Sequence, residues 1–257
     1  MAKDAASEPR YLDREWLKRH IAEEREASDL LGEIREALFG MQDGIVSTLA
    51  VVVAVGAATG DRFSVLVAGI ASALAGVFSM AAGEYLSSKS QREIYDAQIE
   101  GEREEVEQRP AESEAEVAYM LEEEGLPPES ARRIAAEIAR YPNVLLKTMV
   151  EKELGISVEE GHGALHGAIV MGAAFGVAAL VPLIPYLVAP IGLAPWISVA
   201  LCAATLFFFG VVKSRWTRHG ALRSGLEVVA LAAMAGAAGF LFGSLLPALL
   251  GVAGVRG

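Results

Sequence analysis

The chain alternates between long apolar stretches and strongly charged segments. Residues 45–60, 63–83 and 161–212 contain no Asp, Glu, Lys or Arg, and another apolar stretch runs from about 225 to 249. A helix of about 20 apolar residues crosses a bilayer, so residues 161–212 are long enough for two spans. Four prolines mark the turn between them: Pro182, Pro185, Pro190 and Pro195. The pattern predicts an all-α, polytopic membrane protein with five transmembrane helices.

Charge is distributed very unevenly around these stretches. Between Glu93 and Glu160 there are 19 acidic and seven basic residues, whereas the rest of the chain has 14 acidic and 15 basic residues. The formal net charge of −11 therefore arises in this acidic insert. Its field repels nucleic acid and attracts cations, and carboxylate oxygens suit hard or borderline metal ions. We expect the insert to bind metal and expect no nucleic-acid partner.

Prolines and glycines divide the chain into helices and domains. No proline occurs between Phe63 and Pro110, so we expect the second span to continue into the insert as one helix of roughly 45 residues. Three shorter helices are expected over residues 111–124, 129–140 and 143–154, separated by Pro and Gly. The predicted domains are 1–36, a cytoplasmic amphipathic helix; 37–88, spans one and two; 89–160, the cytoplasmic helical insert; and 161–257, spans three to five.

The distribution of Lys and Arg predicts the orientation. Cytoplasmic loops of membrane proteins are enriched in both residues. Seven precede the first span, among them Arg10, Arg14, Lys18, Arg19, Arg25 and Arg35, and four lie between the fourth and fifth: Lys213, Arg215, Arg218 and Arg223. Placing both groups in the cytoplasm also places the insert there. We expect a multi-pass protein of the inner membrane in a prokaryote or of the vacuolar membrane in a eukaryote.

Other features bear on targeting and packing. The first 36 residues contain no long apolar run, so we expect no cleavable signal peptide. The amphipathic helix expected over residues 11–36 could lie on the membrane surface or pack on the insert. Cys202 is the only cysteine and is expected to be a buried apolar residue. Glycines four apart, as at Gly172 and Gly176 or Gly239 and Gly243, predict close helix packing.

Two residues near the membrane could take part in metal transport. Asp43 lies at the apolar start of the first span, where an ionised carboxylate is costly and usually functional. The structural alternative is an interfacial carboxylate or a helix cap. Met80 lies four residues before Glu84 at the end of the second span, and we expect it at a similar depth to Asp43. A carboxylate with a thioether suits a borderline divalent ion, although methionine alone more often fills a gap.

The insert contains carboxylates at helical spacing. Glu102 and Glu105 are three apart, and Glu112 and Glu116 are four apart, so each pair shares one helical face. Paired carboxylates can bridge a metal ion. Acidic residues are so dense here that such spacings also arise by chance, and an ordinary solvated face explains them as well.

The end of the insert adds a soft ligand. Met149 and Glu153 place a thioether and a carboxylate on one face of the last insert helix. His162 and His166 are also four apart, but an ordinary interfacial role is the commoner one for such residues. Glu159 and His162 form one Glu-x-x-His motif, whereas a ferritin-like di-iron centre needs two. No nucleotide-binding loop or serine-hydrolase elbow occurs in the sequence, so neither chemistry has support.

Three short segments, together with the Glu-rich insert, resemble the vacuolar iron transporter family. They are Asp43-Gly-Ile-Val-Ser-Thr-Leu, Ala75-Gly-Val-Phe-Ser-Met-Ala-Ala-Gly-Glu-Tyr-Leu-Ser and Ala221-Leu-Arg-Ser-Gly-Leu-Glu. The resemblance covers nearly the whole chain after about residue 30. It implies a five-span homodimer in the lipid bilayer that exchanges Fe²⁺ for protons, removes it from the cytosol and often accepts Mn²⁺ or related ions. It implies no enzymatic activity and no resident cofactor.

The resemblance also assigns residues. The family's translocation-path aspartate and methionine fall on Asp43 and Met80. Its metal-binding positions fall on Glu102, Glu105, Glu116, Met149 and Glu153. One further family glutamate falls on Ser113, so either neighbour, Glu112 or Glu114, is a candidate replacement. The chain also has Val150 and Ser72 where some members have a methionine and a glutamate.

Three classes of function fit these features to different degrees. A proton-coupled metal exporter explains both Asp43 and the acidic insert. A membrane-anchored ferroxidase explains the carboxylates but lacks the second Glu-x-x-His motif. A metal-sensing or storage protein explains the insert but leaves Asp43 without a role. We therefore expect an exporter whose partners are divalent metal ions, protons, the lipid bilayer and a second copy of the chain.

Overall fold

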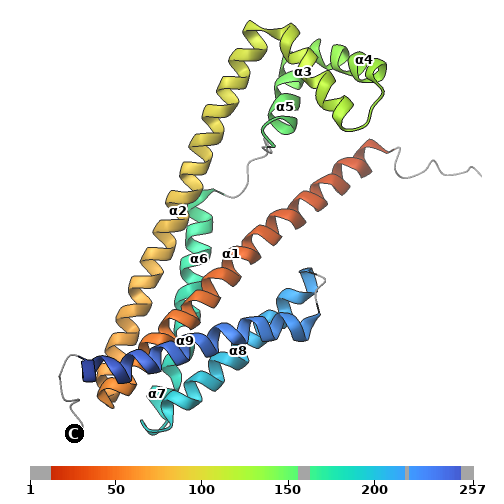
Figure 1. Ribbon diagram of the computed structural model, residues 1–257. Helices are drawn as coiled ribbons and strands as arrows, with labels where there is room; N and C mark the ends of the chain where they lie inside the picture. Colours follow the sequence, from red (N-terminus) through yellow and green to blue (C-terminus); the bar gives the residue numbers. More distant parts are fainter. Residues whose placement is uncertain (1–12, 156–162, 218–219, 250–257) are drawn as a thin grey trace, which may run out of the picture. The chain divides into compact units, whose positions relative to one another are not determined.

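The computed structural model describes residues 13–155, 163–217 and 220–249 (Figure 1). Every regular element in these ranges is helical, which confirms the predicted all-α fold. Contacts divide the chain into a membrane unit, residues 1–85 and 165–257, and an insert unit, residues 86–164. In chain order the elements are α1 (Arg14–Thr59), α2 (Arg62–Gln108), α3 (Pro110–Glu123), α4 (Pro128–Ala139), α5 (Pro142–Lys152), α6 (Ala164–Ala179), η2 (Val181–Leu183), α7 (Ile184–Val188), α8 (Ala194–Thr217) and α9 (Ala221–Leu249).

Among the described residues, five helical segments are long and apolar enough to cross a membrane. They are α1, α2, the run from α6 to α7, α8 and α9. Their number agrees with the five spans predicted from the sequence. The third span is not one continuous α-helix, because Pro182 lies in the 3₁₀ turn η2 and Pro185 is the second residue of the short helix α7.

Helix α1 is a single helix of 46 residues. The sequence pattern separated an amphipathic segment ending at residue 36 from the first span, whereas the structure joins the two without a break. Asp13 caps the start, where its Oδ1 accepts a hydrogen bond from the backbone N–H of Glu15 at 3.0 Å. The helix ends at Gly60, whose positive φ of 64° closes the last turn. No proline interrupts the residues between, so the helix continues through the imperfect period near residues 23–28.

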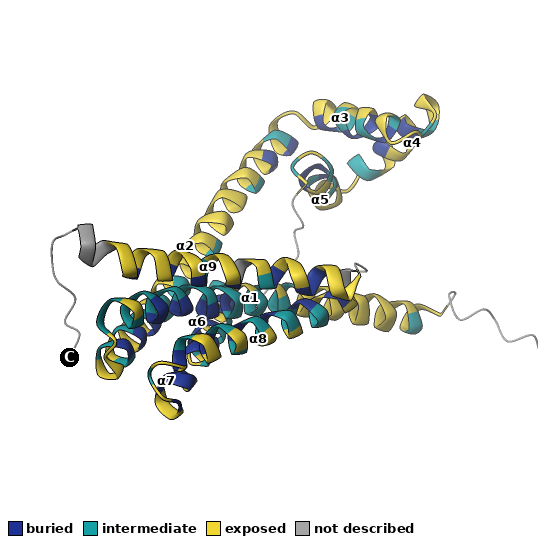
Figure 2. Ribbon diagram, turned by 60° about the horizontal axis from the view of Figure 1, so that its bottom comes forward, coloured by how far each residue is buried: buried dark blue, intermediate teal, exposed yellow. Residues whose placement is uncertain are grey.

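The core of the membrane unit forms where α1 meets α8, α9 and η2. Figure 2 shows buried residues on the facing sides of these helices and exposed residues on their outer sides. Ile45, Leu49 and Val52 of α1 are fully buried, and the hydroxyl of Tyr186 donates to the carbonyl of Val52 at 3.2 Å. Cys202 is buried in the same core and forms no disulfide, as expected for a small apolar residue.

Close approach of α9 to α1 depends on two glycines. A Cβ atom at Gly239 would lie 2.5 Å from the carbonyl oxygen of Ala50, and one at Gly243 would clash with the carbonyl oxygen of Ala54. Because these contacts are with backbone atoms, no side chain can move to relieve them. The glycine spacing therefore provides helix packing within this chain.

The connection between α1 and α2 is stabilised by polar contacts. Asp61 accepts hydrogen bonds from the backbone N–H and the hydroxyl of Ser64, at 2.7 Å and 2.6 Å, and so caps α2. The guanidinium of Arg62 donates to the carbonyl of Ala189 at 2.7 Å, which joins this turn to the end of α7.

The insert unit contains the last turns of α2 together with α3, α4 and α5. Helix α2 spans 47 residues, close to the predicted length. A proline begins each following helix, at Pro110, Pro128 and Pro142, where its missing N–H costs no hydrogen bond. The sequence therefore located these starts to within one residue. The unit has its own apolar core, formed by Val106, Val117, Ala118, Leu121, Ala131, Ala135, Leu145 and Met149.

Candidate metal centre

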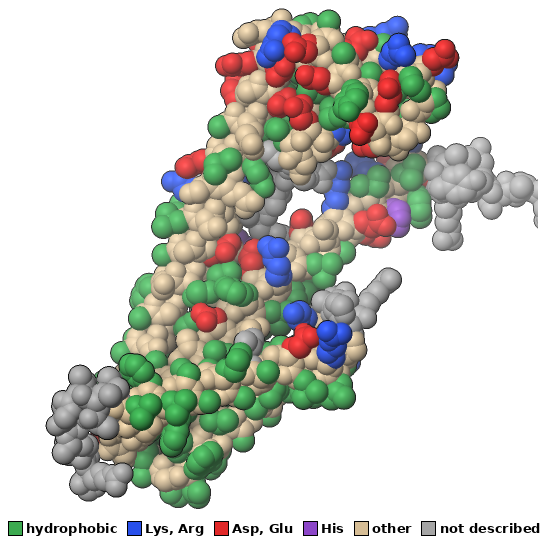
Figure 3. Space-filling model, viewed as in Figure 1, with side chains coloured by type: hydrophobic (Ala, Val, Ile, Leu, Met, Phe, Trp, Pro, Cys, Tyr) green, Lys and Arg blue, Asp and Glu red, His purple; other side chains and the backbone are tan. Residues whose placement is uncertain are grey.

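The candidate metal centre begins with the turn at Pro110. Arg109 lies between the end of α2 at Gln108 and the start of α3 at Pro110, so carboxylates on the last turns of α2 meet those on the first turns of α3. One carboxylate oxygen from each of Glu105, Glu112 and Glu116 lies within 4.8 Å of the other two. Figure 3 shows acidic side chains gathered on the face of the insert unit that is in view. Such a group of oxygen ligands suits a divalent cation.

Arg109 lies beside two of these carboxylates. Its guanidinium is 3.1 Å from Glu105 and 3.0 Å from Glu112. All three side chains are partly or largely exposed, so these ion pairs contribute little to stability. Their effect is to offset part of the negative charge. A bound divalent cation would compete with Arg109 for the same oxygens.

Two further carboxylates belong to the same electrostatic cluster. Burial raises the pKa of Glu102, which is only 9% exposed, and the charges of Glu153, Glu105 and Glu116 raise it further. Burial also raises the pKa of Glu116, followed by the charges of Glu105, Glu153 and Glu112, while Arg109 opposes the shift. Glu153, at the end of α5, is thereby placed near the glutamates of α2 and α3.

Two oxygens in this cluster lack partners. Oε2 of Glu102 and Oε2 of Glu116 are buried, and neither has a hydrogen-bond partner among the described residues. A buried oxygen without a partner is costly, and more so on a carboxylate. A divalent cation shared by these carboxylates would remove both the unmet hydrogen-bonding capacity and the repulsion among like charges.

The structure distinguishes between the two neighbours of Ser113. Glu112 belongs to the group of three close carboxylates, whereas Glu114 is not part of that group among the described residues. Ser113 itself is buried, and its hydroxyl lies 3.4 Å from the carbonyl oxygen of Arg109, to which it donates. Glu112, and not Glu114, therefore lies with Glu105 and Glu116, whereas its role as a metal ligand stays a prediction.

Met149 has a different environment from the glutamates. It is completely buried in the apolar core of the insert unit, together with Leu145 and Val117. This position explains Met149 as a packing residue, and its role as a metal ligand stays a prediction. Its backbone carbonyl accepts a hydrogen bond from the N–H of Glu153 at 2.8 Å, which fixes the end of α5 near the cluster.

The two residues predicted for the translocation path come from α1 and α2. Asp43 and Met80 are both partly buried. Gly44, next to Asp43, packs against the backbone of Phe175 on α6. Met80 packs against the cluster formed by Ala73, Phe175 and Ala179. The backbone next to Asp43 and the side chain of Met80 therefore both lie near residues packed around Phe175, and the similar depth of Asp43 and Met80 stays a prediction.

The sequence pattern named His166 but gave no indication of its partner Glu33, nor of Glu36 and Thr48. Nε2 of His166 on α6 lies 2.9 Å from Oε1 of Glu33 on α1. The carboxylate of Glu36 comes close to Gly167, where a Cβ would be 2.9 Å from Oε2. Thr48 is fully buried, and its hydroxyl lacks a partner among the described residues. The Glu33–His166 pair gives His166 a structural partner independent of His162.

The Glu159–His162 motif and the pairing of His162 with His166 cannot be placed. Residues 156–162 lie outside the described residues. The predictions that rest on Glu159 and His162 therefore stay predictions.

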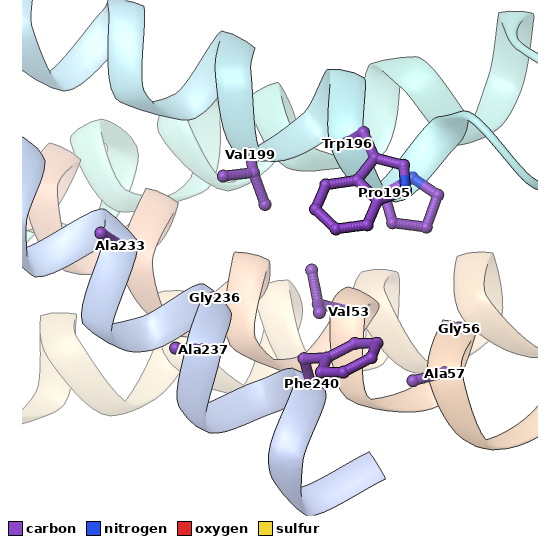
Figure 4. Close-up of a pocket in the computed structure, with 10 residues that line it drawn as sticks. All are labelled: Val53, Gly56, Ala57, Pro195, Trp196, Val199, Ala233, Gly236, Ala237 and Phe240. Carbon is purple, nitrogen blue, oxygen red and sulfur yellow. The ribbon is translucent and has the colours of Figure 1, made fainter. Parts of the chain in front are cut away.

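A large pocket in the membrane unit is unsuited to metal. It has a volume of about 390 Å³ and lies between α1, α8 and α9. Figure 4 shows that apolar side chains surround it, among them Val53, Trp196 and Phe240. None of its lining residues has a carboxylate, imidazole or thiol group. The pocket therefore offers no ligand set for a metal ion.

Comparison with known proteins adds independent information. The sequence profile of the VIT family matches residues 34–244, a range that contains Asp43, Met80 and the acidic cluster. Vacuolar iron transporter 2 of Oryza sativa subsp. japonica is 34% identical over 208 residues, covering 80% of this chain and 85% of that protein. Vacuolar iron transporter 1 of Arabidopsis thaliana is 33% identical over 211 residues, covering 81% and 84%. Protein CCC1 of Saccharomyces cerevisiae is 25% identical over 222 residues, covering 83% and 69%.

Proposed function

Because the chain belongs to the VIT family, we propose that it exports divalent metal ions from the cytosol in exchange for protons, with Fe²⁺ as the main substrate and Mn²⁺ as a second one. The family match carries the assignment to metal transport, and relatives named as iron transporters support iron as the metal. The five apolar helices agree with a multi-pass membrane protein. Proton coupling is the part of the proposal that rests on Asp43.

We assign capture of the metal to the insert unit. Its net negative charge raises the local concentration of cations. Glu105, Glu112 and Glu116 would bind the ion directly, while Glu102 and Glu153 contribute charge and further oxygens. The metal in this scheme is the substrate, so the site must release it as well as bind it. Partly exposed carboxylates that compete with Arg109 suit such reversible binding.

Asp43 would couple metal movement to proton movement. An apolar environment favours the neutral carboxylic acid, whereas a bound divalent cation favours the carboxylate. Metal binding at Asp43 would then release a proton, and protonation would release the metal. Met80 would add a thioether ligand that disfavours Mg²⁺ and Ca²⁺ relative to borderline ions. Because the metal ion and the proton would bind Asp43 alternately, this mechanism supports an exchange of metal for protons.

We also propose the orientation and the assembly. The N-terminus and the insert face the cytoplasm, because this arrangement places the Lys and Arg residues of the α8–α9 connection on the same side. The host membrane is the vacuolar membrane in a eukaryote or the inner membrane in a prokaryote. The protein is proposed to be a homodimer, as the family resemblance implies.

One experiment separates transport from the two alternative functions. Purified protein in liposomes is given Fe²⁺ or Mn²⁺ outside, and metal uptake and oxygen consumption are recorded together. An exporter moves both ions without consuming oxygen beyond the rate in protein-free liposomes. A ferroxidase consumes oxygen with Fe²⁺ and moves neither ion, and a sensing or storage protein binds metal without either signal. Absence of uptake by folded protein that is inserted in the liposomes would overturn the proposal.

A further inference from the structure

A second pocket in the membrane unit combines apolar and basic residues. It has a volume of about 360 Å³ and lies between α1 and α8. Leu31, Ile34 and Leu38 of α1 line it at helical spacing, together with the neighbouring Phe39. Gln42 and two cations, Arg35 from α1 and Lys213 from α8, complete the lining, which contains no Asp or Glu. The pocket therefore has apolar walls and a positive end.

The position of the two cations along the chain places the pocket at the edge of the membrane. Lys213 is the first charged residue after the uncharged stretch that ends at Val212. Arg35 is the last basic residue before the apolar part of α1. Cations at the ends of spanning segments lie at the level of the lipid headgroups. Figure 3 shows further basic side chains near the α8–α9 connection.

The pocket has the wrong chemistry for the transported metal. Two cations and no carboxylate repel a divalent cation, so this pocket is no part of the metal path. A small free anion would be attracted by Arg35 and Lys213 but would leave the apolar wall unused. That wall remains accessible, since Leu31 is 47% and Phe39 is 58% exposed. The best-matched ligand has an anionic group joined to a long apolar chain.

We propose that this pocket binds one anionic phospholipid. The phosphate lies at Arg35 and Lys213, where a guanidinium can donate two hydrogen bonds to a phosphate and an ammonium adds charge. The first part of an acyl chain lies along Leu31, Leu38 and Phe39. Basic pockets between spanning helices bind such headgroups in general. The bound lipid would bridge α1 and α8, and this inference holds whichever ion the protein transports.

Native mass spectrometry of the detergent-solubilised full chain tests the proposal. The protein is titrated with phosphatidylglycerol, with phosphatidylcholine of the same acyl chains, and with glycerol phosphate, which lacks the chains. We expect phosphatidylglycerol to bind more tightly than either of the other two. Replacing both cations, as Arg35→Gln with Lys213→Gln, is expected to weaken its binding by about fivefold for each charge removed. Arg35→Lys is expected to retain most of the affinity.

A matched control removes cations outside the pocket. The double variant Arg215→Gln with Arg223→Gln takes two positive charges from α8 and α9, and neither residue lines the pocket. It should bind phosphatidylglycerol as the unaltered protein does. An equal loss in this control would show attraction to general surface charge and would overturn the proposal.

The unaltered protein gives a second test. If it binds phosphatidylcholine or glycerol phosphate as tightly as phosphatidylglycerol, the proposal is overturned. A change of oligomeric state in the pocket variant, with lipid binding unchanged, would instead assign the pocket to a protein interface.

Discussion

At the scale of single residues, Asp43 has the most specific predicted role. Asp43→Asn keeps the volume of the side chain but cannot exchange a proton at neutral pH. We expect metal-driven proton movement to fall to the level of protein-free liposomes, while the thermal unfolding temperature stays close to that of the unaltered protein. Proton-sensitive dye inside liposomes measures the effect. Asp61→Asn is the control, because Asp61 lies in the α1–α2 connection and its side chain caps a helix. Normal coupled transport by Asp43→Asn would remove this residue from the mechanism.

The carboxylate cluster predicts how pH changes the stability of the insert unit. The pKa values of Glu102 and Glu116 are raised by burial and by neighbouring carboxylates. A raised pKa in the folded state means that the folded protein binds more protons than the unfolded protein in the window above the ordinary glutamate value. The metal-free insert should therefore gain stability as pH falls from about 7 towards about 5 and lose it as pH rises again.

Hydrogen exchange within α3, corrected for the pH dependence of the intrinsic rate, measures this effect in the full chain. Glu116→Gln should increase protection at neutral pH and flatten the pH dependence. Glu114→Gln, outside the group of three carboxylates, should leave both unchanged. Higher protection of the unaltered metal-free insert at neutral pH than at acid pH would contradict the predicted sign.

The sequence could identify most candidate residues, but it could not show which residues lie beside them in the folded protein. Helical spacing and family resemblance pointed to Glu102, Glu105 and Glu153 because both depend on local sequence. The choice of Glu112 over Glu114 needed the turn at Pro110, which sets the side chains of α3 against those of α2. The contact of His166 with Glu33 spans 133 positions in the chain, and no local pattern indicates it.

At the scale of helices, local chemistry determined the boundaries well. Prolines at the first position of α3, α4 and α5 made their starts predictable. The absence of proline made the length of α2 predictable. The continuity of α1 was missed because its hydrophobic period is imperfect near residues 23–28, although these residues favour a helix. Hydrophobic periodicity indicates a helix only where one face of that helix is buried. Residues 23–28 are exposed on all sides, so their sequence carries no such periodicity.

The contact between α1 and α9 gives a prediction at this scale. Gly243→Ala places a methyl group against the carbonyl of Ala54, a backbone atom of α1. Overpacking of this kind costs about 1–3 kcal/mol, so thermal unfolding in detergent should occur at a lower temperature. The matched control is Gly32→Ala on α1, where a Cβ would meet no atom within 4 Å. That change should be neutral or stabilising by up to about 1 kcal/mol. Equal effects of the two substitutions would contradict the proposed close packing.

At the scale of the whole molecule, the insert unit is expected to change shape when it binds metal. Spin labels at Glu107→Cys on α2 and Glu151→Cys on α5, both exposed positions, report the distance between these helices. The buried native cysteine is replaced by Cys202→Ala. Diamagnetic Zn²⁺ should shift or narrow the distance distribution, because one ion shared by Glu105 and Glu153 would draw the helices together. A ligand shifts such an equilibrium only if it binds one arrangement better than the other.

The control for this measurement combines Glu105→Gln and Glu153→Gln, which should abolish the response. An unchanged distribution at saturating Zn²⁺ in the unaltered cluster would leave the insert as a passive trap for cations. Transport and capture would then remain part of the proposed function, whereas a conformational role for the insert would be excluded.

The central claim is that metal moves in one direction while protons move in the other. It is tested most directly by recording Mn²⁺ uptake and internal pH together in liposomes that contain the purified protein and no ATP. A proton gradient directed outward should drive Mn²⁺ inward against its own gradient, and an imposed Mn²⁺ gradient should drive protons outward in the absence of any pH difference. Both movements should disappear in Asp43→Asn. Uptake of Mn²⁺ that stops at equal concentrations and ignores the proton gradient would contradict the exchange mechanism.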